Sequence, residues 1–387
     1  MSFIHFGCWN QGFCNKETIN NGMSAVMNAL SHRDAPSFYI VAGDNYYPKK
    51  IKYDDDSKIK IFNEKNFKSG MNCLMQLKEK ASVFMLMGNH DLVAEDKLFL
   101  NIDEHEARKE RPPEEKKGDM CTIIKKELGY AKDFNIYEHS IIIPNSKTVC
   151  LFINSVLYSG DLTNPPDIVC LKQLKPTEYT SFTTLKQIIN YEEAQLFNLL
   201  DQILDKWEIR NLVIVGHDPI VTSRNKKKKG PTVHILQERG FQFLKALYDK
   251  VPHAHKYYLC ADTHQYQKAS IILGDHEITQ HVVGTGGTEC DDEEIQNNAE
   301  YVDINSTVKY RLLETNRSFG YLYCDKEEES DNINCVFHPV AGCNDFSGEV
   351  SAQGGVGSGE QKQGGGRISR KRKNKKKRTK KKSRRKR

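Results

Sequence analysis

Residues 37–48, SFYIVAGDNYYP, place an apolar run directly before a glycine, an aspartate, an asparagine and two tyrosines. An apolar run of this length that ends in glycine predicts a buried strand, with the polar side chains just beyond its carboxyl end. Further apolar runs end in the same way, in the sequences FGCWN (6–10), MGNHD (87–91), VGHDPI (215–220) and CADTHQ (260–265). Because α/β sheets place their ligand sites at the carboxyl ends of strands, we expect these loops to meet at one site.

Strands and helices alternate along most of the chain. Buried strands are predicted at residues 3–6, 37–42, 83–87, 149–153, 212–215 and 257–259. Between them, apolar residues recur at the three- and four-residue spacing of amphipathic helices at 17–30, 65–80, 191–207 and 237–250. This alternation predicts an α/β layered domain. Residues 269–337 show strand-like runs broken by turn residues, which predicts a sheet-rich C-terminal half that packs against the first half.

The net charge of +6 hides two regions of opposite sign. Residues 367–387 hold 16 of the 57 basic residues, so the preceding 366 residues carry 41 basic against 51 acidic residues. We therefore expect a folded domain at 1–345, a flexible Gly/Ser-rich linker at 346–366 and a disordered Lys/Arg-rich tail at 367–387. Such a tail would bind polyanions such as DNA, RNA or acidic lipid headgroups without sequence specificity, or act as a nuclear-import signal.

The sequence also bears on the cellular compartment. No apolar run approaches the ~18 residues of a spanning helix, so no transmembrane segment is expected. The opening residues MSFIHFGCWN lack the charged region and the long apolar run of a secretory signal. The 11 cysteines are odd in number, widely spaced and without a C-x-x-C pair, which we interpret as reduced thiols of an intracellular protein, in the cytoplasm or nucleus.

The polar clusters at the strand ends supply carboxylate, amide, imidazole, phenol and thiol groups. Carboxylate, amide and imidazole together suit two cations ~3.5–4 Å apart that share one bridging carboxylate. Gly43, Gly88 and Gly216 stand just before candidate ligands, where a missing side chain lets the backbone turn sharply and approach a metal closely. The sequence therefore predicts a two-metal site.

The order and spacing of these motifs resemble the calcineurin-like metallophosphoesterases, over roughly residues 1–325. GDNYY (43–47), GNHD (88–91) and GHDP (216–219), followed by KKGPT (228–232), most closely resemble the tartrate-resistant, purple acid phosphatase branch. The resemblance implies a four-layer α-β-β-α sandwich and the hydrolysis of phosphoesters, with phosphomonoesters as the favoured phosphorylated substrates. It also implies two metal ions, drawn from Fe, Mn or Zn.

The resemblance implies a ligand role for five residues that match the family's pattern. The carboxylate of Asp44 would bridge the two metals. Tyr47 and His264 would join it at the first metal, and Asn89 and His217 at the second.

Two catalytic residues and two departures complete this picture. By the resemblance, His90 would donate a proton to the leaving oxygen of the substrate, steered by Asp91. Cys8 stands where the family has its first aspartate, and it is either a thiolate ligand or an inert packing thiol. Asp262 stands where the family has the first histidine of a G-H-x-H motif, and we expect it to coordinate a metal.

Alternative interpretations remain open at this point. The segment RNKKKK (224–229) either reaches a substrate phosphate or, as we favour, forms a solvated charged loop. The activity is either that of a phosphomonoesterase or that of a phosphodiesterase or nuclease delivered to nucleic acid by the tail. A third function, suggested by the loss of the first aspartate, is that of a catalytically silent relative that binds polyanions or other partners.

Overall fold

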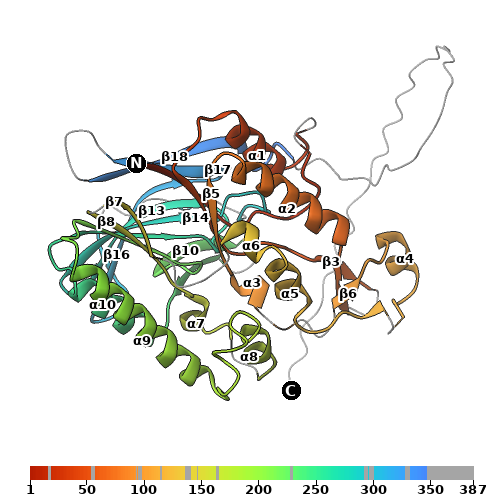
Figure 1. The fold of residues 1–387 in the computed structure, drawn as a ribbon. Helices are drawn as coiled ribbons and strands as arrows, with labels where there is room; N and C mark the ends of the chain where they lie inside the picture. Colours follow the sequence, from red (N-terminus) through yellow and green to blue (C-terminus); the bar gives the residue numbers. More distant parts are fainter. Residues whose placement is uncertain are drawn as a thin grey trace, which may run out of the picture. The chain divides into compact units, whose positions relative to one another are not determined.

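Two β-sheets lie at the centre of the fold (Figure 1). The first has five strands in the order β18-β17-β1-β2-β5, which are β18 (Ile333–Gly342), β17 (Ser318–Lys326), β1 (Ser2–Phe6), β2 (Phe38–Ala42) and β5 (Ser82–Leu86). The second has eight, in the order β15 (Val302–Asp303), β16 (Val308–Asn316), β13 (Tyr266–Leu273), β14 (His276–Val283), β12 (His255–Cys260), β9 (Asn211–Val215), β8 (Thr148–Phe152) and β7 (Ile141–Asn145). Tyr266 of the second sheet stacks on Phe337 of the first, so the two sheets pack against each other.

The computed structural model describes residues 1–346, except for 16–18, 54–56, 93, 95–97, 114–115, 136–140, 146, 163–164, 227–229, 292–294, 296–299 and 327–331. Residues Met1–Ser347 form one compact unit. The predicted linker, apart from Phe346, and the predicted basic tail lie outside the described residues. Within the described part of the chain, no helix is both long enough and apolar enough to span a bilayer.

The central strands are buried because their sequences are apolar throughout. Every residue of β2, β8 and β9 is buried, as expected for parallel strands that are covered on both faces. β2 pairs in parallel with β1 and β5 in the first sheet, and β9 with β8 and β12 in the second. The six predicted strands are thus confirmed, and their carboxyl ends point the same way within each sheet.

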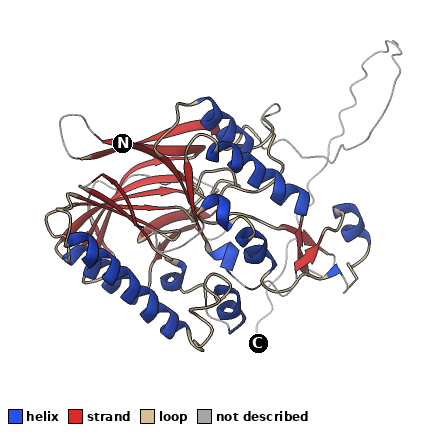
Figure 2. Cartoon of the chain, viewed as in Figure 1, coloured by secondary structure: helices blue, strands red, loops and turns tan. Residues whose placement is uncertain are grey.

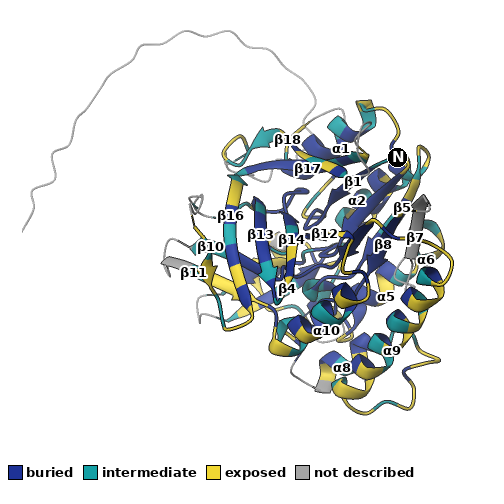
Figure 3. Ribbon diagram, turned by 90° about the vertical axis from the view of Figure 1, so that its left-hand side faces the viewer, coloured by how far each residue is buried: buried dark blue, intermediate teal, exposed yellow. Residues whose placement is uncertain are grey.

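Helices cover the outer faces of both sheets (Figures 1 and 2). α1 (Gly22–His32) and α2 (Glu64–Lys78) lie against the first sheet, and α9 (Leu185–Leu204) and α10 (Glu238–Asp249) against the second. α2, α9 and α10 turn an apolar side inward and leave a polar side exposed, whereas α1 is mostly buried (Figure 3). This arrangement confirms the predicted four-layer α-β-β-α sandwich. The remaining helices are short: α3 (Asn89–Leu92), α4 (Glu104–Lys109), α5 (Thr122–Leu128), α6 (Ala131–Phe134), α7 (Val156–Ser159) and α8 (Pro165–Leu171).

Local sequence signals set where the longer helices begin. The side chain of Asn21 accepts a hydrogen bond from the backbone of Ser24, so α1 begins at Gly22 and not at residue 17 as predicted. At α9, Thr184 and Gln187 form a capping box, so this helix begins six residues before the predicted start at 191. The apolar spacing located both helices, and the caps fix their first turns.

The strands predicted within residues 269–337 are present, but they do not form a separate half. β13, β14 and β16 extend the eight-stranded sheet, whereas β17 and β18 extend the five-stranded one. β17 runs antiparallel to β1, with Ser2 opposite Asp325. The C-terminal strands therefore complete both sheets.

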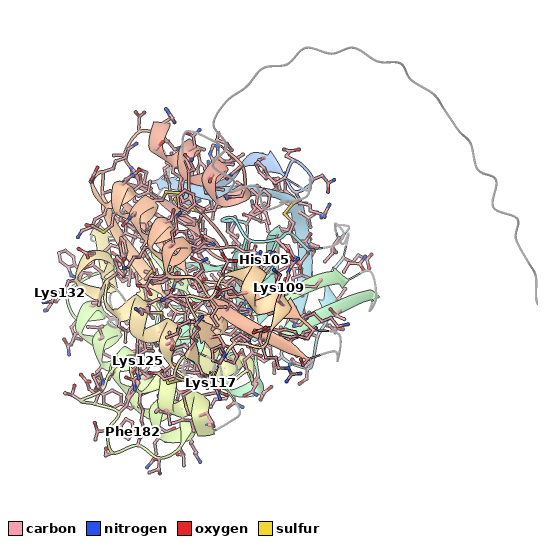
Figure 4. The ribbon with its side chains drawn as sticks, turned by 90° about the vertical axis from the view of Figure 1, so that its right-hand side faces the viewer. His105, Lys109, Lys117, Lys125, Lys132 and Phe182 are labelled. Atoms are coloured by element: carbon pink, nitrogen blue, oxygen red, sulfur yellow. A yellow bond between two sulfur atoms is a disulfide. The ribbon has the colours of Figure 1, made fainter. Side chains whose placement is uncertain are left out.

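A small three-stranded sheet lies beside the main body (Figure 1). It consists of β3 (Lys49–Lys52), β4 (Lys58–Phe62) and β6 (Leu98–Leu100). Ile102 and Ala107 pack with isoleucines of β3 and β4 into a second, minor core. Of the charged segment 103–119, Ala107 is buried in this minor core, while the side chains of Lys109 and Lys117 are exposed (Figure 4).

Eight of the 11 cysteines form disulfides: Cys14–Cys73, Cys121–Cys170, Cys290–Cys343 and Cys324–Cys335. The other three, Cys8, Cys150 and Cys260, are free and buried. The expectation of reduced thiols is therefore wrong. The partners lie 11 to 59 positions apart, so only the folded chain reveals the pairs. Because disulfides persist in oxidising environments, the thiol-based argument for an intracellular location no longer holds.

This pairing predicts the number of free thiols. After purification without reductant and unfolding in guanidinium chloride, the chain should react with three equivalents of a thiol reagent, and with 11 after reduction. Replacement of Cys8 by serine should lower the first count by one. A count near 11 before reduction would contradict the pairing.

Two uncharged histidines lie between the sheets. His5 of β1 donates a hydrogen bond from Nε2 to the carbonyl oxygen of Cys260 in β12, and burial lowers its pKa to about 4. His281 of β14 lies close enough for the two rings to influence each other, and burial, with Lys268 and His5, lowers its pKa to about 3. In the unfolded chain both would titrate near 6.5, so only the unfolded state takes up their protons in mild acid.

Stability should therefore fall as the pH drops below about 6.5, by about 1.4 kcal/mol per pH unit for each of these histidines until its folded-state pKa is reached. Replacement of His281 by glutamine removes one of the two histidines. The free energy of unfolding should then depend less steeply on pH, by about 1.4 kcal/mol per pH unit between about pH 6 and pH 4. Urea unfolding measured across this range tests the expectation. Equal slopes for the variant and the wild type would contradict it.

Candidate metal centre

Three strands end in the same backbone conformation. Cys8, Asp44 and Asp262 each lie two residues beyond the end of β1, β2 and β12, and their φ angles are 51°, 52° and 53°. Non-glycine residues rarely adopt this left-handed conformation, and it is concentrated at functional sites. Here the left-handed conformation occurs at Cys8, Asp44 and Asp262, which all lie in the clusters from which the sequence predicted a site.

The loops after β2 and β5 approach each other closely. A Cβ atom on Gly88 would lie 2.3 Å from Oδ1 of Asp44, and one on Gly43, which has a φ of 81°, would lie 2.6 Å from the nitrogen of Gly88. Any side chain at either position would force the loops apart. The two glycines therefore bring the GDNYY and GNHD loops together, while their predicted close approach to a metal stays a prediction.

One group of ligand atoms gathers around Oδ2 of Asp44. Sγ of Cys8, a carboxylate oxygen of Asp44 and a ring nitrogen of His264 all lie within 4.8 Å of one another. The Tyr47 hydroxyl donates a hydrogen bond to Oδ2 of Asp44 at 2.6 Å and lies 3.3 Å from Nε2 of His264. The structure thus brings Tyr47, His264 and the shared Asp44, which the sequence assigned to the first metal, together with Cys8, whose role the sequence left open.

A second group lies on the side of Oδ1 of Asp44. Nε2 of His217 is 3.3 Å from this oxygen. The opposite ring nitrogen, Nδ1, lies 2.7 Å from the carbonyl oxygen of Ala42, which can only accept, so Nδ1 carries a proton and Nε2 is left for a second proton or a metal. His217, Asp218 and Asp262 also offer ligand atoms within 4.8 Å of one another.

Asn89 presents its amide in the orientation that a metal ligand needs. Its Nδ2 donates a hydrogen bond to Asp161 at 2.9 Å, which leaves the carbonyl oxygen Oδ1 for the pocket. Oδ1 is buried and has no hydrogen-bond partner among the described residues, and the same holds for Nε2 of His217. Buried polar atoms without hydrogen bonds are uncommon, and within the described part of the chain Nε2 of His217 has only the ion-pair contact with Asp44, so a bound cation would satisfy both atoms. The residues present therefore fit a second metal ion.

The charges of the pocket are dominated by carboxylates. Burial raises the pKa of Asp218 to about 7, whereas Arg224 and His217 outweigh burial at Asp262 and hold its pKa at about 2. Burial alone would lower the pKa of His217, but Asp44, Asp218 and Asp262 raise it to about 9. A bound metal would balance these carboxylates and displace the second proton of the imidazole.

Cys8 is the least usual member of the site. Burial, together with the neighbouring carboxylate of Asp44, raises the pKa of its thiol well above the ordinary value. Its sulfur lies 3.9 Å from Oδ2 of Asp44. Without a cation the sulfur is therefore a neutral thiol, and it would become a ligand only if a metal displaced its proton.

His90 and Asp91 occupy different surroundings. His90 is half-buried, its ring centre lies 4.8 Å from that of Tyr47, and its backbone nitrogen donates to Oδ1 of Asp44 at 3.0 Å. The Asp91 carboxylate instead accepts hydrogen bonds from the backbone nitrogens of Gly88 and Asn45, at 2.8 and 2.9 Å. Asp91 thus ties the GNHD loop to the GDNYY loop, and its steering of His90 stays a prediction.

The sequence analysis missed two members of the site. Asp218 was quoted within GHDP but not assigned a role, although it lies in the second ligand group. Arg224 was expected in a solvated loop, which is wrong: its side chain is 12% exposed and forms an ion pair with Asp262. The signal for Arg224 was the alternation of Thr222 and Arg224 on one face of β10 (Val221–Lys226), which forms a hairpin with β11 (Gly230–Ile235).

Comparison with known proteins identifies the family. The model of the calcineurin-like phosphoesterase family matches residues 1–266, a range that contains every residue of the site described above. The chain therefore belongs to the calcineurin-like phosphoesterase family, as its motifs predicted. No curated protein matches the chain.

Two solved structures are similar to this chain at low identity. One is the purple acid phosphatase PPD1 from yellow lupin (Lupinus luteus) seeds, with 11% identity and a TM-score of 0.43, over 89% of this chain and 52% of the lupin chain. The other is PhoD, with 11% identity and a TM-score of 0.41, over 92% of this chain and 73% of PhoD. This chain thus spans about half the length of the lupin phosphatase.

The placement of Asp44 between the two groups predicts the effect of its removal on metal binding. The wild type should bind two Mn²⁺ or Zn²⁺ ions per chain, and Asp44→Asn should bind less than one, because each oxygen of Asp44 faces a different group. Equilibrium dialysis followed by metal analysis measures the ratio. As a control, Asp249→Asn changes an exposed carboxylate paired with Lys245 and should leave the ratio unchanged. Unaltered binding by Asp44→Asn would refute the shared-ligand arrangement.

Proposed function

We propose that this protein is a metal-dependent phosphoesterase with a dinuclear metal centre and that phosphomonoesters are its substrates. The observation that carries the proposal is the convergence of metal-type ligand atoms on both oxygens of Asp44. Membership of the calcineurin-like phosphoesterase family supports the reaction class. The GDNYY motif, which resembles that of the purple acid phosphatases, supports monoesters as the substrate class.

The proposal divides seven candidate ligands between the two metals. Cys8, Tyr47 and His264 would hold one metal, and Asn89, His217 and Asp262 the other, with Asp44 shared between them. When bound, the metals would supply Lewis-acid activation of the attacking water and of the phosphoryl oxygens. The Ala42 carbonyl keeps the His217 ring oriented, and Asp91 holds the two ligand loops in register.

His90 is the group best placed to protonate the leaving oxygen. Its side chain is half-buried, so one part of it contacts the site and another part is accessible to a substrate. Its backbone bond to Asp44 fixes the start of α3 beside the ligands, and its ring packs on Tyr47. A general acid in such a position contributes ~10²–10⁴-fold in rate.

The test uses leaving groups of different basicity. With Mn²⁺, Zn²⁺ or Fe added, the wild type should hydrolyse both nitrophenyl phosphate and an alkyl phosphate, and Asp44→Asn should lose activity on both. His90→Ala should lower kcat by ~10²–10⁴-fold on the alkyl phosphate and far less on nitrophenyl phosphate, because a nitrophenolate leaves without a proton.

His105→Ala, which changes an exposed histidine of α4, serves as the control (Figure 4). Absence of turnover by the metal-loaded wild type would refute the proposed function. Equal losses on the two substrates in His90→Ala would refute only the role of His90 as the acid.

A further inference from the structure

Arg224 is a buried cation at the edge of the metal centre. Its Nη2 donates to Oδ2 of Asp262, and its Nε donates to Oγ1 of Thr263 at 3.0 Å. Its charge also acts on Cys8 and His264, which belong to the other ligand group. The guanidinium therefore influences both groups of candidate ligands.

The strand that carries Arg224 is held rigidly. Buried Gln267 of β13 donates from Nε2 to the carbonyl oxygen of Ser223 at 2.6 Å, and its Oε1 accepts from the Thr222 hydroxyl at 3.0 Å. Gln280 of β14 binds the backbone in the same way, at the nitrogen of residue 220 (2.8 Å) and the carbonyl of residue 221 (2.7 Å). The side-chain amides of Gln267 and Gln280 thus hydrogen-bond to residues 220–223, as the backbone of an adjacent strand would. These bonds hold β10, which carries Arg224, against the eight-stranded sheet.

The pairing with Asp262 leaves part of the guanidinium available. An arginine side chain has five N–H groups, and Asp262 and Thr263 each take one. For the other three, no acceptor is recorded among the described residues. Arginine binds phosphate oxygens through such pairs of N–H groups, with a geometry that lysine cannot reproduce.

Charge points to the same role. By the resemblance, Asp262 stands where the family has a histidine, so it adds one negative charge beside the candidate ligands, and Arg224 pairs with it. Without this arginine, the added carboxylate would repel an anionic ester. Arg224 therefore offsets the negative charge of Asp262 at the site, and the charge of Asp291 also acts on this guanidinium.

We propose that Arg224 is a substrate-binding residue that takes a non-bridging oxygen of the phosphate and thereby selects monoesters over diesters. This inference rests on the proposed phosphoesterase activity. A phosphomonoester offers three non-bridging oxygens and up to two negative charges, whereas a diester offers two oxygens and one charge. The guanidinium of Arg224 adds a positive charge to those of the metal ions. A monoester has a further charged oxygen that can pair with it, and a diester does not.

The experiment compares variants on matched substrates. Arg224→Gln should lower kcat/KM on nitrophenyl phosphate by about 100-fold and on bis(nitrophenyl) phosphate by less than about threefold, with Arg224→Lys between the wild type and Arg224→Gln. Calorimetry on the metal-loaded protein should show about 100-fold weaker binding of inorganic phosphate to Arg224→Gln. Arg239→Gln is the control, because Arg239 forms a similar ion pair with Glu193 outside the site.

A second variant separates substrate binding from support of Asp262. In Asp262→His/Arg224→Gln, the carboxylate that needs a partner is gone, so metal binding should match that of the wild type. If Arg224 only neutralises Asp262, this double variant regains phosphate affinity and monoester preference, which would overturn the inference. If Arg224 binds substrate, both losses persist.

The outcomes also separate this inference from the proposed function. A wild type that is inactive on every ester refutes the phosphoesterase proposal, whatever Arg224 does. An active wild type whose selectivity and phosphate affinity survive in Arg224→Gln refutes only the role of Arg224.

Discussion

The carboxylate of Asp44 is shared between two groups of ligand atoms, and the rest of the site is arranged around it. Its Oδ2 faces Cys8 and Tyr47, while its Oδ1 faces His217 and the backbone of His90. This sharing requires a left-handed backbone at Asp44, with glycine at residues 43 and 88. The buried strands that carry these loops supply the rigidity that keeps such a conformation in place.

Much of this arrangement could be predicted from the sequence. Apolar runs located the six central strands, and polar clusters after four of them located Asp44, Asn89, His217, Asp262 and His264. These features are local, since a strand and the loop that leaves it are adjacent in the chain. The convergence of the loops then follows from the general rule that parallel strands present their carboxyl ends at one edge.

The features that escaped prediction depend on contacts between distant segments. Arg224 reads as part of a basic run, and only its burial against Asp262, 38 residues later, reveals that it belongs to the site. The disulfides likewise join cysteines whose spacing carries no motif. The assignment of strands 269–337 to two different sheets has the same cause, because local pattern fixes a strand but not its neighbour.

Two exchanges change the chemistry of the site while the fold stays that of the family. By the resemblance, Cys8 puts a thiol that is neutral without a metal in place of a carboxylate, and Asp262 puts a carboxylate in place of an imidazole. The first removes a negative charge and the second adds one, so the number of charges around Asp44 is nearly conserved. Such paired changes redistribute charge within a buried pocket, where a net change would be costly.

The position of β1 has a consequence for biosynthesis. β1 leads directly to Cys8, yet one of its two neighbours in the sheet is β17, in which Asp325 pairs with Ser2. During synthesis, β1 (residues 2–6) must wait for β17 (residues 318–326) before this part of the sheet closes. Long-range pairing of this kind slows folding and leaves an apolar edge open to other chains. The edge of β1 that later receives β17 therefore needs protection until β17 has been synthesised.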